Sequence, residues 1–97
     1  MITKGELFVK AIVTVVGKDR VGIIASVCVK LAEFNVNVMD ISQTVMQGYF
    51  TMMMVVDVSK TTLPLALVCQ HMEAHGQEMG LSIRVQREDI FEAMHRV

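Results

Sequence analysis

The sequence predicts an α+β sandwich, in which a four-stranded antiparallel sheet carries two helices on one face. Three observations support this prediction. Two apolar segments have the length and period of helices, four others are rich in β-branched residues or alternate in polarity, and they follow one another as strand, helix, strand, strand, helix, strand.

The first strand and helix are predicted over residues 10–16 and 21–34. Residues 10–16 are almost wholly apolar and β-branched, which predicts a central strand ending at Gly17. The segment 21–34 is too long for a strand, and Ser26, Lys30 and Glu33 are spaced to form one solvent-facing stripe on a helix. Because the rest of that helix is apolar, we expect it to pack on the sheet and also to contact a partner.

A hairpin is predicted over residues 36–58. Residues 36–46 and 49–58 have strand composition, and Gln47-Gly48 between them is typical of a two-residue turn. Alternation along residues 49–58 places every second side chain in the core. It leaves Met53 and Val55 as an apolar patch on the opposite, open face of the sheet. The predicted core set is Phe50, Met52, Met54, Val56 and Val58.

The last predicted elements are a helix, a strand and a short terminal helix. Residues 59–62 form a loop, Pro64 lies in the first turn of the helix, and Gly80 follows its end. The apolar stripe of that helix is Leu65, Val68, Met72, His75 and Met79, and the next strand alternates at Leu81, Ile83 and Val85. Right-handed crossovers then give a ferredoxin-like βαββαβ arrangement over residues 9–87.

Both ends of the chain receive separate predictions. Residues 88–97 are expected to form a short amphipathic helix with Ile90, Phe91, Met94 and Val97 on its apolar side. Residues 1–8 show no clear period, and we treat them as an N-terminal extension. Our hypothesis is that the natural chain begins at Val9, from a GTG start codon, rather than at Met1. Mass spectrometry of the native N-terminus tests this.

Composition excludes several classes of function. The chain is 53% hydrophobic and 20% charged, and charged residues interrupt its apolar runs, so we expect no membrane span. A net charge of −1 gives no basic footprint for direct nucleic-acid binding. Cys28 and Cys69 are isolated in apolar segments and suggest no secreted disulfide framework. We therefore expect a cytoplasmic protein.

The sequence offers no set of residues for catalysis or for a cofactor. No nucleophile–base pair is evident, and the Gly17–Gly22 spacing lacks the Lys and Ser/Thr of a phosphate-binding loop. His71 and His75 are one helical turn apart, but no third metal ligand is evident, so a histidine at the edge of the core is favoured for His75. We predict neither catalysis nor a metal site nor a cofactor.

The most informative segment is the loop between the first strand and the first helix, Gly17-Lys18-Asp19-Arg20-Val21-Gly22. Such a loop presents backbone N–H groups at a helix N-terminus, which attract a carboxylate or phosphate. Asp19 is placed to receive an ammonium group. A loop that binds both a carboxylate and an ammonium group is suited to an α-amino acid, which carries both. The simpler alternative, favoured by the local pattern alone, is that the glycines permit the turn and Asp19 caps the helix.

Two longer segments resemble a known family. Residues 15–24, with Asp19-Arg20-Val21-Gly22 at their centre, resemble the opening motif of ACT domains, and residues 31–44 resemble the second-strand motif of that family. The two motifs stand at the expected separation, and the resemblance spans residues 9–86. The tail, residues 87–97, is similar to that of the small single-domain UPF0237 proteins, which are related to the glycine-cleavage-system transcriptional repressor.

This resemblance implies a regulatory module that binds a small amino acid as a homodimer. In ACT regulatory domains the ligand lies between subunits, against the first strand–helix loop of one and an Asn at the start of the second strand of the other. Here the loop is Gly17, Lys18, Asp19, Arg20, Val21 and Gly22, and the Asn is Asn37. The alternative is a dimerisation or protein-interaction module without a ligand, with Phe91 and Met94 of the tail as a docking surface for a protein partner.

Overall fold

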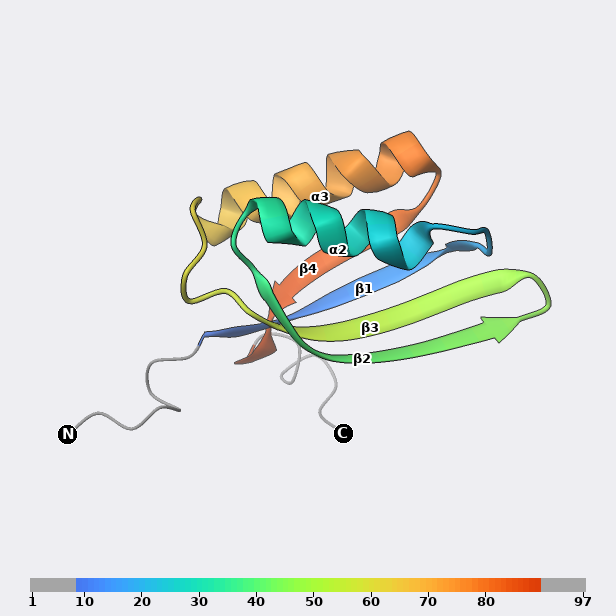
Figure 1. Ribbon diagram of the computed structural model, residues 1–97, viewed down its shortest axis with the longest axis horizontal. Coiled ribbons are helices and arrows are strands. Elements are labelled where there is room, and N and C mark those ends of the chain that lie inside the picture. The colour runs from blue at the N-terminus through green and yellow to red at the C-terminus, as the bar shows by residue number, and fades with distance from the viewer. Residues whose placement is uncertain (1–8, 90–97) are drawn as a thin grey trace.

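The computed structural model describes residues 9–89, in which six elements build a two-layer α+β sandwich (Figure 1). The elements are β1 (Lys10–Lys18), α2 (Ile23–Glu33), β2 (Asn37–Met46), β3 (Tyr49–Asp57), α3 (Leu65–Met79) and β4 (Ser82–Arg87). The predicted order and fold class are confirmed. The predicted helix over 88–97 begins at Glu88 and Asp89, and the rest of it lies outside the described residues, as does the extension 1–8.

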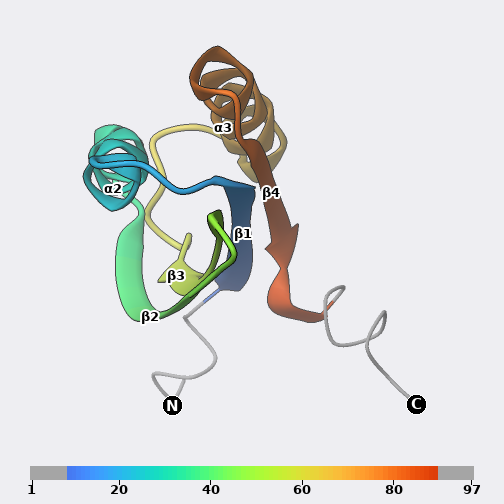
Figure 2. The ribbon, with the colours of Figure 1, turned by 90° about the vertical axis from the view of Figure 1, so that its right-hand side faces the viewer.

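The four strands form one antiparallel sheet in the order β2-β3-β1-β4. β1 is central, as its continuous apolar sequence predicts, and pairs with β3 on one side and β4 on the other. Both helices cover the same face of the sheet, α2 on the β2 side and α3 on the β4 side (Figure 2). The outer edges of β2 and β4 therefore have no strand beside them among residues 9–89.

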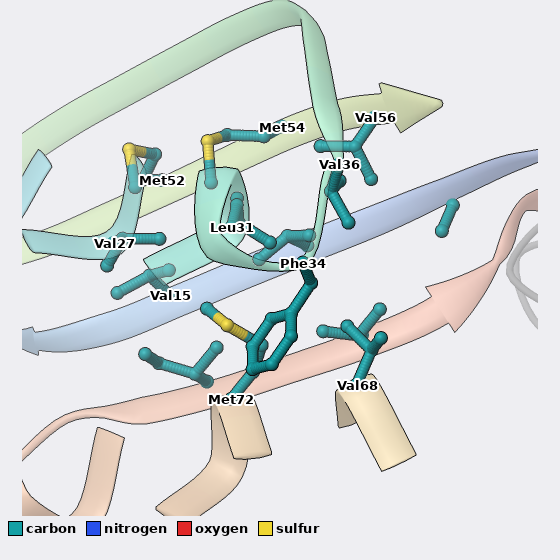
Figure 3. Packing of buried hydrophobic residues seen from close by; sticks show 14 of the residues in the cluster. Val15, Val27, Leu31, Phe34, Val36, Met52, Met54, Val56, Val68 and Met72 are labelled. Atoms are coloured by element: carbon teal, nitrogen blue, oxygen red, sulfur yellow. The ribbon is translucent and has the colours of Figure 1, made fainter. Parts of the chain in front are cut away.

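The core lies between the helices and the sheet. Leu31 of α2 is 1% exposed and points down between side chains of β1 and β3 (Figure 3). From α3, Val68 and Met72 are fully buried. The predicted alternation of β3 is confirmed, since its buried set is Phe50, Met52, Met54, Val56 and the following Val58.

Two turns have the backbone geometry that their sequences predict. Gln47 and Gly48 both have positive φ, 51° and 82°, which is the geometry of the predicted hairpin turn. Gly80 ends α3 in the left-handed region at φ 72°. Gly76 serves another purpose, because a Cβ there would lie 2.8 Å from the carbonyl oxygen of Leu81, so α3 packs closely on β4.

Three details differ from the sequence predictions. β1 continues through Gly17 to Lys18, so Gly17 does not end the strand. Ser26 faces α3 instead of solvent, so the predicted polar stripe is wrong at that position. A β-bulge between Val38 and Asp40 inserts Met39 into β2, and it turns Ile41 and Val45 toward the helix-covered face.

Candidate functional site

The loop between β1 and α2 lies at one end of the sheet, beside the β2–β3 hairpin (Figure 1). The backbone N–H of Asp19 donates to the carbonyl oxygen of Gly48 at 2.9 Å, which joins the loop to the hairpin turn. Lys18, Asp19 and Arg20 are all exposed, and the Val21 side chain is fully exposed. The structure thus gathers the predicted loop residues at the surface, with a carboxylate between two cationic side chains.

The N-terminus of α2 opens onto this loop. Gly22 is its N-cap residue at φ 93°, and no side chain caps the helix, so the alternative in which Asp19 caps α2 is wrong. The first-turn N–H groups therefore lack a side-chain partner, and the helix dipole adds partial positive charge there. Within residues 9–89, no hydrogen bond or ion pair holds the Asp19 carboxylate. The loop thus combines a helix start without a side-chain cap and an exposed carboxylate three residues before the N-cap.

Two residues of the loop between β1 and α2 contact other elements of the fold. A Cβ at Gly17 would press on Cδ2 of Leu81, so a larger residue there would have to displace the end of the Leu81 side chain. The Arg20 guanidinium donates a hydrogen bond to the carbonyl oxygen of Met79 in the last turn of α3, where the helix dipole favours a cation. The loop is thereby attached to the start of β4 and to the end of α3.

A polar contact between the two helices is missed by the sequence analysis. Ser26 Oγ lies 2.9 Å from His75 Nε2 and 3.1 Å from Met79 Sδ. The prediction that the chain has no nucleophile–base pair is therefore wrong, since a serine hydroxyl and a histidine ring are in contact. Within the described residues no carboxylate bonds to His75, so the orienting third group of a catalytic triad is absent there. The contact joins α2 to α3 close to the loop.

Asn37 lies far from the loop within one chain. It begins β2 opposite Asp57, at the end of the sheet where β1 starts, whereas the loop follows the other end of β1 (Figure 1). The nine residues of β1 separate the two positions by roughly 25 Å. The structure therefore brings together Gly17 to Gly22 and does not bring Asn37 to them.

Comparison with known proteins identifies the family. The model of the ACT domain matches residues 10–86. A UPF0237 protein of Listeria innocua is 50% identical over 88 residues, covering 91% of this chain and 99% of its own length. This chain belongs to the ACT domain family, in its UPF0237 group.

Solved structures agree with this assignment. An ACT domain protein from Streptococcus pneumoniae superposes with a TM-score of 0.76 at 48% identity, covering 90% of this chain and 98% of that one. A candidate glycine cleavage system transcriptional repressor shares the fold with a TM-score of 0.71 at 24% identity, over 84% of this chain and 46% of that one. The ACT resemblance and the ferredoxin-like fold predicted from the sequence are both confirmed.

The remaining chemistry of this ACT domain lies away from the loop. Over residues 9–89 no group of His, Cys, Asp and Glu side chains is arranged to hold a metal ion. The His71 ring instead packs against Phe34, at 5.2 Å between ring centroids. In the same part of the chain, neither helix has both the length and the apolar character needed to cross a membrane.

Burial raises the pKa of the Cys69 thiol, and the nearby Glu73 carboxylate raises it further. The thiol donates a hydrogen bond to the carbonyl oxygen of Val85 at 3.3 Å. Since the folded pKa exceeds the unfolded one, the folded state holds this proton more tightly. We expect the free energy of unfolding to fall as pH rises above about 8.5. In urea titrations from pH 7.5 to 10, Cys69→Ala should flatten this decline and Cys28→Ala should not; equal slopes in all three proteins would contradict the assignment.

Proposed function

We propose that this ACT domain is a homodimeric regulatory module that binds a small α-amino acid, or a similar zwitterion, between its two subunits. The observation that carries the proposal is the separation of the loop from Asn37. Residues suited to one ligand stand at opposite ends of the same sheet, so a second copy is required to complete the site.

The dimer we propose joins the sheets edge to edge through β2. β2 is exposed along nearly its whole length, and its outer edge has no neighbour among the described strands. Long exposed edge strands are rarely left unpaired, because their N–H and C=O groups recruit another strand. Antiparallel pairing of the two β2 edges places the start of one β2 beside the end of the other, which carries Asn37 of the second copy toward the loop of the first.

An apolar surface accompanies this edge. Ala25, Cys28 and Ala32 recur at helical spacing on the flank of α2 away from α3, and Ala25 and Ala32 are exposed. Below them, Ile41 and Val45 of β2 are 40% and 53% exposed on the helix-covered face. We call these five residues the α2–β2 surface. Small residues on the helix let two helices approach closely, and apolar burial then favours association.

Each part of an amino acid has a receptor in the proposed site. The uncapped first turn of α2 after Gly22 receives the carboxylate, the exposed Asp19 carboxylate receives the ammonium group, and the Asn37 amide of the second copy serves as donor or acceptor to either. Lys18, Arg20 and Val21 line the loop on the same surface. Binding stabilises the subunit arrangement that completes the site, and a partner protein senses that arrangement.

A panel of the common amino acids tests the proposal by thermal unfolding. Ligand at about a hundred times its Kd stabilises the folded state by ~2.7 kcal/mol, which raises the Tm of a domain this size by roughly 10 °C. Asp19→Ala should abolish the shift without changing the Tm of the unliganded protein, because the side chain is exposed. Glu33→Ala, an exposed carboxylate at the other end of α2, should retain the shift.

Failure of the panel distinguishes the two functions considered for this chain. If no amino acid at millimolar concentration raises the Tm while the protein remains a dimer, ligand binding is excluded. The domain is then a dimerisation or protein-interaction module. A shift that survives Asp19→Ala would instead place the ligand away from the loop.

A further inference from the structure

Ile12 has an unexpected environment. Side chains of β1 alternate, and Ile12 and Val16 both point to the open face of the sheet, opposite the helices. Yet Ile12 is 7% exposed, whereas Val16, on the same strand and face, is 42% exposed. Among residues 9–89, Ile12 is also the one buried apolar residue outside the cluster under the helices.

Burial on this face decreases with distance from Ile12. Its neighbours in the sheet are Val55 on β3 and Gln86 on β4, and Val55 is partly buried. Farther along β3, Met53 is 39% and Tyr49 is 58% exposed. Both helices lie on the other side of the sheet (Figure 2), so they cannot produce this gradient. The atoms that bury Ile12 therefore lie on the open face of the sheet, close to Ile12 and to the end of β4.

An apolar hollow lies beside Ile12 on its other side, toward β3 and β2. A depression of about 200 Å³ is lined by side chains of β1, β2 and β3 on either side of Val55. Its lining residues are Ile12, Asp40, Ile41, Ser42, Met53, Met54 and Val55. A sheet face with an apolar hollow is suited to the apolar side of a short helix.

The end of the chain leaves the sheet on the β4 side of Ile12. Gln86 pairs with Ile12, β4 ends at Arg87, and the backbone turns helical at Glu88. Across this turn the Arg87 guanidinium donates hydrogen bonds of 3.2 and 2.8 Å to the Asp89 carboxylate. Eight residues follow, which as a helix reach about 12 Å. Their apolar side chains, Ile90, Phe91, Met94 and Val97, share one side of such a helix.

We propose that residues 90–97 of the same chain pack on the open face of the sheet, with Phe91 and Met94 over Ile12 and Val55. The segment has the apolar spacing, the length and the starting point that covering Ile12 requires. Residues 1–8 precede β1 in the sequence but lack any such spacing. The docked segment occupies the open face and leaves the β2 edge free, so the proposal does not depend on the dimer or its ligand.

A tryptophan reporter tests this packing in the whole 97-residue chain, whose sequence contains no tryptophan. In Phe91→Trp, we expect blue-shifted emission and a quenching constant for acrylamide several-fold below that of a peptide of residues 88–97 with the same replacement. Adding Val55→Lys should raise the constant to the peptide value, because a charge then lies under the segment. Adding Val16→Lys, on the same face at the uncovered end, should leave it unchanged.

Three results would overturn the proposal. The first is a reporter as accessible in the parent protein as in the peptide. The second is protection that is lost on dilution to the monomer, which would assign the segment to the face of a second copy. The third is loss of protection after deletion of residues 1–8, which would make that segment part of the cover. Circular dichroism of each variant verifies that the sheet and helices are retained.

Discussion

Leu31→Ala is expected to lower the free energy of unfolding by about 2–5 kcal/mol. The side chain is 1% exposed and lies at the centre of the contacts between α2 and the two central strands (Figure 3). Removing it forfeits the transfer free energy of the lost carbons and leaves a cavity that surrounding strands cannot close. At roughly 4–8 °C for each kcal/mol, much of the thermal stability of the domain is lost.

Urea unfolding at fixed protein concentration measures this change as a shift in midpoint at constant slope. Leu67→Ala on α3 is the matched control, because Leu67 is 39% exposed and its truncation leaves no enclosed cavity. The control should lose less than about 1 kcal/mol. Similar losses for the two variants would mean that α2 does not pack on the sheet as described.

Val45→Glu is expected to convert the proposed dimer into monomers. Val45 lies on the helix-covered face of β2, within the α2–β2 surface, so the edge-to-edge interface would bury one unpaired carboxylate toward each of its two ends. An unpaired buried charge costs several kcal/mol, and even ~2.8 kcal/mol raises the dimer Kd about a hundredfold. Sedimentation equilibrium over a range of concentrations measures the Kd, and the amino-acid response should be lost together with the dimer.

Two further variants decide which surface associates. Leu67→Glu places the same charge on exposed α3, away from β2, and should leave the Kd unchanged. Tyr49→Glu alters the open face of the sheet, where Tyr49 is 58% exposed. A dimer that tolerates Val45→Glu and dissociates with Tyr49→Glu would mean that two sheets pack face to face.

The features predicted well are those governed by local physics. Alternation along β3, the hairpin turn at Gln47-Gly48 and the left-handed Gly80 each depend on a few adjacent residues. The bulge at Met39 has no such local signal. Without it, the polar residues that follow Val38 in alternation would face the helices, so it is the tertiary packing of Ile41 beside Met54 that selects the register.

The residues of the candidate site could be predicted from the sequence. Their arrangement in space could be predicted only in part. The loop from Gly17 to Gly22 follows from its glycines and its position before a helix. The packing of Gly17 against Leu81, the bond from Arg20 to α3, and the Ser26–His75 contact join residues distant in sequence, which spacing cannot reveal. Nor does the sequence show that Asn37 stands at the far end of the sheet from the loop.

The hairpin of β2 and β3 has a consequence for how the chain folds. Its two strands are joined by a two-residue turn, whereas Val13 of β1 finds its partners Met54 and Val85 far along the chain. Local hairpins close within microseconds, and distant pairings form later because loop-closure entropy opposes them. We therefore expect the exposed β2 edge to exist before β1 is inserted into the sheet. During refolding at high concentration, that edge makes premature pairing between chains the main route to misassembly.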